Sequence, residues 1–488
     1  MSRSATPETR SLKTGALGIP SIVFFVVAAA APLGASLGAG PVVFIFAGPG
    51  APAMYVIASI VLLLFAVGFA AMSRFVTSAG GFVSFAAHGL GRWGGYAAAG
   101  VALFAYFGML LGIFAQLSVF TAELLAALFG WDVSWQLMMI IGIAVIGVMG
   151  YLEINVSMIV VGTLIVLEIA ILLLFDFAVL AQGGADGINF DAFALTNVIT
   201  PGMGAGLLFA FTCFVGFEAT VIYGEEAKNP KRTVPIATYV AILLIGGLYS
   251  FTMWAVGLAW GTDEVQDAAI EHMPDFFFIP NDIFVGSWAT LLMRILTVTS
   301  LVAVVLAFHN TISRYLFSLG RARFLPSRLG MTHPRFQSPA AASIVVSVVS
   351  LVVLSLFMFS GADPMAVIFT WLVGIGGLGV LVMQAAGAAS VVAYFMRRPS
   401  GLNVWVRLLA PTLGFIGLLA AIILAFTNFG LVVSAEEGPA LLLPWLLPVA
   451  ALIGIVIGVV RVRTGVIPDL EAGLAEGEEE AVHAGLHR

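Results

Sequence analysis

Residues 18–46 read GIPSIVFFVVAAAAPLGASLGAGPVVFIF, a stretch without a charged side chain. At about 1.5 Å per residue, a helix of this length can cross the hydrocarbon core of a bilayer, which is about 30 Å thick. Its middle reads APLGASLGAGP, at 31–41. The residues there that form helices poorly are Pro32, Gly34, Gly38, Gly40 and Pro41. The stretch therefore predicts a membrane-spanning helix that is interrupted near its centre.

The composition of the whole chain indicates a membrane protein with many spans. Of its 488 residues, 61% are hydrophobic and only 9% are charged. A soluble domain carries about 25% charged residues, so a soluble enzyme or nucleic-acid-binding protein is disfavoured. The long continuous apolar runs favour an all-α bundle over a barrel. Twelve such runs occupy residues 18–46, 52–73, 94–120, 135–152, 154–181, 204–223, 234–258, 285–312, 340–359, 366–395, 406–427 and 441–460.

The charges are sorted by side of the membrane. With the N-terminus in the cytoplasm, every one of the 20 basic residues except Arg294 falls on the cytoplasmic side, as the positive-inside rule requires. The loop between the seventh and eighth runs carries acids only. These are Asp263, Glu264, Asp267, Glu271, Asp275 and Asp282. The sorting predicts twelve spans in the plasma membrane with both termini in the cytoplasm, and a polar, Glu-rich tail from Pro468 that is expected to be disordered.

No metal and no cofactor are expected. The single cysteine, Cys213, lies inside an apolar run and makes no intrachain disulfide. No cluster of His, Cys, Asp and Glu has the spacing of metal ligands. The clustered glycines lack the lysine of a phosphate-binding loop, which disfavours an ATP-driven pump.

A second interruption lies in the sixth apolar run. There FTCFVGFEA, at 211–219, places Gly216 and Glu218 in the middle of an apolar segment. The two interrupted runs are five spans apart, and an odd offset means that the second unit enters the membrane from the opposite side, as an inverted repeat requires. Each break alone could be a packing groove or a kink. The matched pair predicts a substrate site between the two halves.

The chemistry of such a site follows from the freed backbone groups. A half-helix start offers N–H groups that attract a carboxylate, and a half-helix end offers C=O groups that attract an ammonium group or a metal cation. Glycine lets a ligand approach the backbone closely. This pair of poles suits a zwitterion.

Three segments resemble signatures of the amino acid–polyamine–organocation superfamily. They are FVGFEATVIYGEEAKNPKRTVP (214–235), MSRFVTSAGGFVSFAAHGLGR (72–92) and FHNTISRYLFSLGRARFLPSRLGMTHPRFQSP (308–339). The resemblance covers roughly residues 12–400 and implies secondary transport of amino acids or amines. It also implies a 5+5 inverted repeat of the leucine-transporter type, with discontinuous helices 1 and 6 and two extra C-terminal helices.

The implied layout divides the chain into six parts. These are a cytoplasmic N-tail (1–17), a first repeat (18–181), an external loop (182–203), a second repeat (204–395), two extra helices (396–461) and a cytoplasmic acidic tail (462–488). Many superfamily members carry G-[SA]-G-I at the first break, whereas this chain reads PLGASLGAG. We therefore place the carboxylate-binding residues by position, at Ala31, Pro32, Leu33, Gly34, Ala35 and Ser36.

The remaining candidates for substrate binding are assigned from the second break and the third span. They are Tyr106, Phe211, Thr212, Phe214, Gly216, Phe217 and Glu218. Glu218 either holds the substrate ammonium group or caps N–H groups freed by the break. The phenylalanines either line the site or pack the bundle. Tyr106 is a candidate contact because its hydroxyl needs a partner in the membrane.

Glu168 is the candidate for ion coupling. It lies about 21 Å along the fifth run from its cytoplasmic start, between apolar sequences. Burial penalises the charged form of a carboxyl group, so Glu168 could bind the coupling proton. By resemblance, some sodium-independent members place a lysine at what looks like this position. The alternative is a permanent ion pair between Glu168 and Arg294, which could instead snorkel outward.

Four further residues are weighed with it. Thr299 and Ser300 could complete a sodium site, as span-8 hydroxyls do in sodium-coupled relatives with this fold, or bond back to their own helix, as Thr297 also could. Asp176 falls at the outer interface and is expected to be a solvated end residue.

These observations predict an amino acid permease that works by alternating access and is proton-coupled, not an enzyme. Its expected partners are a small-molecule substrate, H⁺ or Na⁺, and the bilayer, with no nucleic acid. Alternatives are an amine or polyamine carrier, an amino-acid exchanger, or a sodium symporter. A polyamine would require several acids, and residues 14–50 contain none. A receptor or channel is the non-transport alternative.

Overall fold

The computed structural model describes residues 18–76, 81–152, 158–218, 220, 229–333, 338–398, 401–435, 437–466, 468 and 470. The predicted N-tail and most of the acidic tail lie outside these residues. So do parts of the three superfamily-like segments, at 77–80, 219, 221–228 and 334–337. The described part of the chain is built from helices and contains no strand.

The long helices are α3 (Ala51–Met72), α5 (Arg92–Phe129), α7 (Met158–Gln182), α11 (Pro230–Trp260), α14 (Ser287–Arg321), α15 (Ala340–Ser360), α16 (Thr370–Arg397), α17 (Ala410–Thr427) and α19 (Leu446–Arg463). Shorter helices are α1 (Ile19–Ala30), α2 (Pro32–Ala47), α4 (Gly81–Leu90), α6 (Trp135–Tyr151), α8 (Leu195–Val198), α9 (Met203–Thr212), α12 (Val265–Glu271), α13 (Phe278–Phe284) and α18 (Phe429–Val432). Within the described ranges, nine helical segments are long and apolar enough to cross a membrane.

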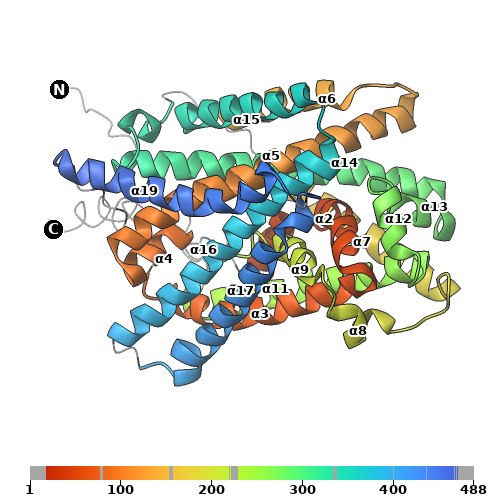
Figure 1. Ribbon diagram of the computed structural model, residues 1–488, viewed down its shortest axis with the longest axis horizontal. Helices are drawn as coiled ribbons and strands as arrows, with labels where there is room; N and C mark the ends of the chain where they lie inside the picture. Colours follow the sequence, from red (N-terminus) through yellow and green to blue (C-terminus); the bar gives the residue numbers. More distant parts are fainter. Residues whose placement is uncertain are drawn as a thin grey trace, which may run out of the picture.

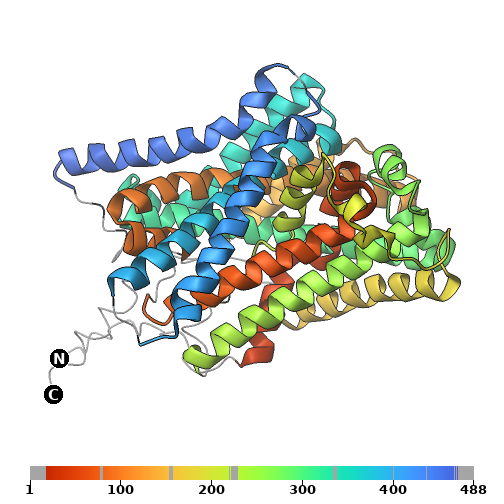
Figure 2. The same cartoon turned by 60° about the horizontal axis from the view of Figure 1, so that its bottom comes forward.

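The helices pack around α5, which runs along the molecule beside α14 and α19 (Figure 1). α5 also packs closely against α16. Glycines allow this approach, since a Cβ atom on Gly108 would lie 2.9 Å from the Cα of Gly376. A second packed pair, α3 and α11, lies side by side in Figure 2.

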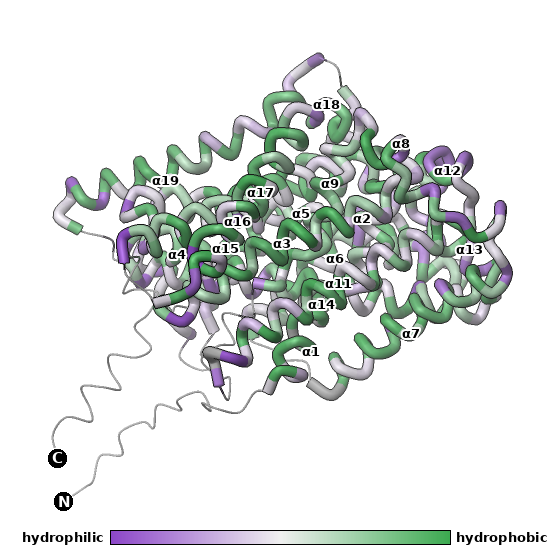
Figure 3. Tube along the Cα trace, turned by 90° about the horizontal axis from the view of Figure 1, so that it is seen from below, coloured by the Kyte–Doolittle hydropathy of each residue, from purple (hydrophilic) through white to green (hydrophobic). Residues whose placement is uncertain are grey.

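The surface matches a bilayer environment. Hydrophobic stretches fill the middle of the molecule in Figure 3, and hydrophilic stretches gather mainly near α12 and α13 at one end and near α4 and the end of α19 at the other. On α15 the exposed residues Ile344, Val348, Val352 and Leu356 follow one another at four-residue spacing. An outward apolar stripe of this kind is suited to lipid.

The first interruption is much shorter than the predicted stretch 31–41. Only Ala31 departs from helical geometry, with φ +43° and ψ +74°, and α2 resumes at Pro32. Proline is tolerated at this first helical position because it needs no N–H group there. The remaining glycines lie inside α2 and serve packing instead: a side chain on Gly38 would collide with the amide of Gln116.

The second interruption begins where α9 ends, at Thr212. Residues 213–218 form turns, and Gly216 has φ +113°, a value that favours glycine. α2 and α9 pack against each other. The two interrupted segments therefore lie together in the middle of the bundle, as Figure 1 shows.

Candidate functional site

A cavity of about 50 Å³ lies at the junction of α1 and α2. Its other walls come from α5, the end of α9, α14, and a π-helical turn at Pro364–Phe369 that leads into α16. Of the residues predicted to bind substrate, Ala31, Gly34, Ala35 and Thr212 line this cavity. The polar side chains on its wall are those of Gln116, Thr212 and Cys213, and the described lining residues include no charged one.

The start of α2 is held by a network of three helices. The Leu33 N–H donates to Glu168 Oε2 at 3.4 Å, and the Gly34 N–H donates to Ser300 Oγ at 3.4 Å. The Ser300 hydroxyl in turn donates to Glu168 Oε2 at 2.9 Å. Glu168 is only 3% exposed. The predicted coupling residue therefore caps the half-helix to which we assigned the substrate carboxylate.

Gln116 on α5 was missed by the sequence reasoning. Its Nε2 donates to the Gly34 carbonyl at 2.9 Å, and its amide lies against Gly38. Among the described residues its Oε1 has no hydrogen-bond partner. An uncharged polar side chain inside an apolar run was the available signal, because such a side chain needs partners in the membrane.

Glu218 is bonded to the second break and to α5. Its Oε2 accepts the Gly216 N–H at 2.9 Å, and its Oε1 accepts the Tyr106 hydroxyl at 3.2 Å. The Tyr106 ring stacks on Tyr315 with centroids 5.5 Å apart. Neither Glu218 nor Tyr106 lines the cavity. In this conformation Glu218 bonds to the backbone of the break and to Tyr106, and it does not face the cavity.

The predicted aromatic residues of the second break are packing residues here. Phe211, Phe214 and Phe217 are buried and lie off the cavity wall. Phe214 meets Tyr249 edge-on, and Phe217 meets the ring of Phe65 in the same way. Pro32, Leu33 and Ser36 are also off the wall. The Ser36 hydroxyl is buried without a partner among the described residues.

The hydroxyl residues of α14 have two different roles. Thr297 and Thr299 bond back to the carbonyls of Met293 and Leu296, at 2.7 and 2.9 Å. Ser300, by contrast, joins the Glu168 network. Of these three hydroxyls, that of Ser300 bonds to another helix, at 2.9 Å from Glu168 Oε2.

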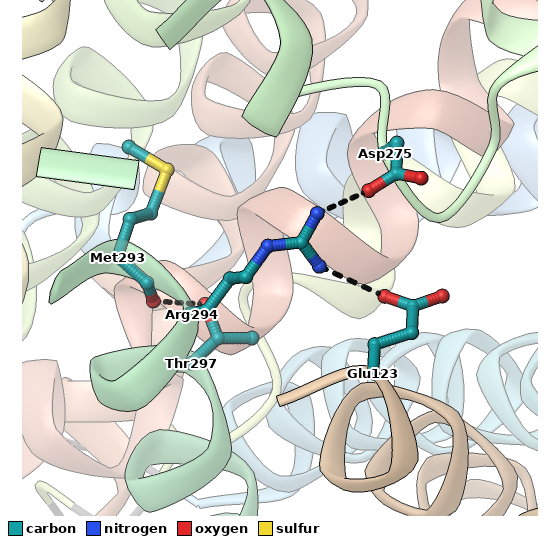
Figure 4. A network of polar contacts seen from close by, with 5 residues as sticks. All are labelled: Glu123, Asp275, Met293, Arg294 and Thr297. Carbon is teal, nitrogen blue, oxygen red and sulfur yellow. Dashed lines mark hydrogen bonds and ion pairs between the residues drawn. The ribbon is translucent and has the colours of Figure 1, made fainter. Parts of the chain in front are cut away.

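The alternative of a permanent ion pair between Arg294 and Glu168 is wrong. Arg294 pairs with Glu123 of α5 at 3.2 Å and with Asp275 of the segment between α12 and α13 (Figure 4). Its guanidinium also lies 4.0 Å from the centroid of the Phe278 ring. The segment between α12 and α13 reaches α14 and supplies a partner, Asp275, that was not apparent from depth along the helix alone.

The expectation for Asp176 is also wrong. It was predicted to be solvated, but it is fully buried and accepts the Thr252 hydroxyl of α11 at 2.8 Å. α7 extends to Gln182 and packs against α11, so its outer turns are covered. Within the described ranges, no three His, Cys, Asp or Glu side chains gather as a metal site.

Comparison with known proteins adds a family match. The family model described as amino acid permease matches residues 17–458. An uncharacterised transporter of Mycobacterium bovis is 28% identical over 251 residues, which is 51% of each chain. Cationic amino acid transporter 4 of Homo sapiens is 24% identical over 37% of this chain and 27% of its own length.

A third relative is the glutamate/serine transporter AimA of Bacillus subtilis. It is 25% identical over 45% of this chain and 39% of its own. The chain spans about half the length, or less, of these curated relatives.

Proposed function

The chain belongs to the amino acid permease family, and from that membership we propose that it is a secondary transporter that moves amino acids across the plasma membrane by alternating access, coupled to protons. The observation that carries the proposal is the broken helix at Ala31, where the start of α2 lines a cavity between α5, α9 and α14. Transport rather than an enzymatic reaction also fits the names of the relatives.

We propose twelve crossings in a 5+5 inverted repeat, with repeats at 18–181 and 204–395 and two extra helices within 396–461. Helices five spans apart pack against each other at four places, which supports this assignment. The pairs are α2 with α9, α3 with α11, α5 with α14, and α6 with α15. Elements near a pseudo-two-fold axis meet their symmetry mates in this way. The distribution of the basic residues supports a topology with both termini in the cytoplasm.

The proposed substrate is a small amino acid whose carboxylate binds at Ala31–Ser36. A ligand that brings its own carboxylate matches the N–H groups at the start of α2. The lining supports an uncharged side chain over a cationic one, since an amine or polyamine would bring positive charge to a wall without a described carboxylate. Thr212 and Gln116 are the polar contacts available to the substrate.

Glu168 is the proposed coupling residue. It lies in α7, in the membrane, and among the described residues no Lys or Arg pairs with it. A carboxyl group buried in the membrane without a basic partner is less costly in its neutral form, so it can bind and release a proton during transport. A sodium ion held by Glu168 and Ser300 is the alternative; Thr299 contributes less to it, because its hydroxyl bonds back to Leu296.

The test is a panel of radiolabelled amino acids and amines offered to proteoliposomes, with and without Na⁺ and an inward pH gradient. We expect accumulation of small uncharged amino acids that needs the pH gradient and is indifferent to Na⁺. Gly34→Leu should abolish substrate binding, since a Cβ atom there would lie 3.2 Å from Leu301 and 3.3 Å from Ser300. Gly247→Leu is the matched control, with open space around its Cβ position.

Two results would contradict the proposal. Accumulation of polyamines alone would show that the substrate is not an amino acid. Full substrate binding in a well-folded Gly34→Leu variant would show that the substrate does not bind at the start of α2.

A further inference from the structure

We infer that Glu168 is a tethered competitor of the substrate: its carboxylate and the substrate carboxylate compete for the start of α2, and a proton on Glu168 releases that start to the substrate. The inference rests on the proposed function and adds to it a mechanism for linking the proton to the substrate. Both carboxylates would use the same positive end of one half-helix, so only one can be charged there at low energetic cost.

The first turn of α2 has no spare donor in this conformation. Pro32 carries no N–H group. The Leu33 N–H is engaged by Glu168 and the Gly34 N–H by Ser300. The Ala35 N–H donates to the Ala31 carbonyl at 2.9 Å, as in a regular helix. A substrate carboxylate can therefore bind this turn only after Glu168 and Ser300 give up their bonds.

The cavity borders the same turn of α2, but Glu168 and Ser300 do not form part of its wall. Gly34 and Ala35 line the cavity. Ser36 follows in the next turn, with a buried hydroxyl that lacks a partner among the described residues. A ligand that entered from the cavity would meet backbone already capped by the protein's own carboxylate, beside a hydroxyl that is free to donate.

No basic side chain among the described residues neutralises the charge of ionised Glu168. α7 packs against α1, α2, α11, α13 and α14. From α11 the nearby titratable group is Tyr249, whose hydroxyl donates to the Ala30 carbonyl at 3.0 Å. On α14 the basic residues inside the span are Arg294, which pairs with Glu123 and Asp275, and His309, which bonds to Ser343. On α7 itself Asp176 bonds to Thr252. The start of α2 and Ser300 are thus the groups that stabilise ionised Glu168.

Protonation changes this balance in one direction. An ionised Glu168 holds Leu33 and repels a second carboxylate. A neutral Glu168 accepts more weakly and carries no charge, so the helix start becomes available to the substrate. Linkage then requires that the substrate binds more tightly as the pH falls, by up to about tenfold per pH unit for one proton, and that bound substrate favours protonation equally.

The experiment measures equilibrium binding of L-alanine and of L-alaninamide to the purified full-length protein in lipid nanodiscs. The pH runs from about 5 to about 7, where the α-amino groups of both ligands stay protonated. We expect L-alanine to bind more tightly toward pH 5. L-alaninamide lacks the competing carboxylate, so it should bind weakly and with no such dependence. A full amino acid panel at pH 5 identifies a replacement ligand and its amide if L-alanine is not bound.

Two variants complete the test. Glu168→Gln imitates the neutral acid, so it should bind L-alanine across the range as tightly as the wild type does at pH 5. Asp176→Asn changes another buried carboxyl two turns along α7 and should keep the wild-type pH dependence.

The outcomes separate this inference from the proposed function. Weaker binding in Glu168→Gln at every pH, or equal pH dependence for L-alanine and its amide, overturns the competition while leaving amino acid binding intact. A loss of pH dependence in Asp176→Asn would show that Asp176, and not Glu168, binds the proton, and would overturn the inference. Failure of every amino acid to bind at any pH would overturn the proposed function itself.

Discussion

Gln116 carries a specific expectation at the residue scale. It fixes the Gly34 carbonyl beside the break and presents its Oε1 without a described partner at the cavity wall. Gln116→Leu removes one buried hydrogen bond and one polar contact to the ligand. We expect substrate affinity to fall about tenfold, or about 1.4 kcal/mol, as measured by direct binding.

The matched control for Gln116 is Gln384 on α16. It is equally buried, and neither atom of its amide has a partner among the described residues. Gln384→Leu should leave affinity unchanged and stability equal or higher, since it removes unsatisfied polar atoms. Equal losses in both variants would mean that the Gln116 effect is general destabilisation of the bundle.

Single residues were predictable from the sequence where the cause is local. Gly34 and Glu168 stand out because a glycine in a break and a carboxyl in an apolar run are visible in one segment. Asp176 and Arg294 were misjudged because their surroundings come from other elements. Thr252 of α11 covers Asp176, and Asp275 reaches Arg294 from an outer segment. Depth along one helix does not contain that information.

At the scale of elements, Arg294 joins three of them. Its side chain is 20% exposed, that of Glu123 28%, and that of Asp275 45%. Arg294→Met leaves two carboxyl groups facing each other without a cation, so we expect it to lower the free energy of unfolding by about 2 kcal/mol. Asp275→Asn should cost under about 1 kcal/mol, because its group is well solvated. Thermal unfolding in nanodiscs measures both.

Two comparisons make that result interpretable. Glu271→Gln alters the exposed pair with His272 and should have no measurable effect. A double-mutant cycle between Arg294→Met and Glu168→Gln should give additive losses, because the two residues do not touch. Strong coupling in that cycle would instead support the alternative of an ion pair between Glu168 and Arg294.

Helix limits were predictable to the extent that hydropathy determines them. α5 and α14 begin near the predicted spans but continue to Phe129 and Arg321, past the apolar runs. The break of the first span was predicted over eleven residues and is confined to Ala31. Glycine and proline form helices poorly in water, but in a packed membrane bundle neighbouring helices compensate, so Gly38 serves as a packing surface for Gln116.

At the scale of the whole molecule, the proposed topology can be tested with introduced cysteines. Cys213 is the only cysteine in the chain and is buried, so Cys213→Ala provides a background without reactive thiols. Glu264 and Ser327 are both exposed. In intact cells an impermeant maleimide should label Glu264→Cys and should label Ser327→Cys only after permeabilisation. The reverse labelling pattern would show that the chain has the opposite orientation in the membrane.

The helical membrane architecture was predictable because charge and hydropathy are sorted along the whole chain. The packing of α2 on α9 was suggested by the matched pair of breaks, whereas no local pattern indicates the packing of α5 on α14. The network that joins Glu168, Ser300 and Leu33 draws on three separate helices. Its members could be suspected one by one, but their bonding could not.

In the proposed mechanism, Glu168 carries the proton that drives accumulation at the broken helix. The most direct measurement compares counterflow with pH-driven uptake of one amino acid in the same proteoliposomes. In Glu168→Gln we predict that counterflow of the amino acid persists, since the neutral variant still binds and exchanges it, while accumulation driven by a pH gradient is lost. Accumulation in Glu168→Gln with an unchanged dependence on the pH gradient would contradict the account.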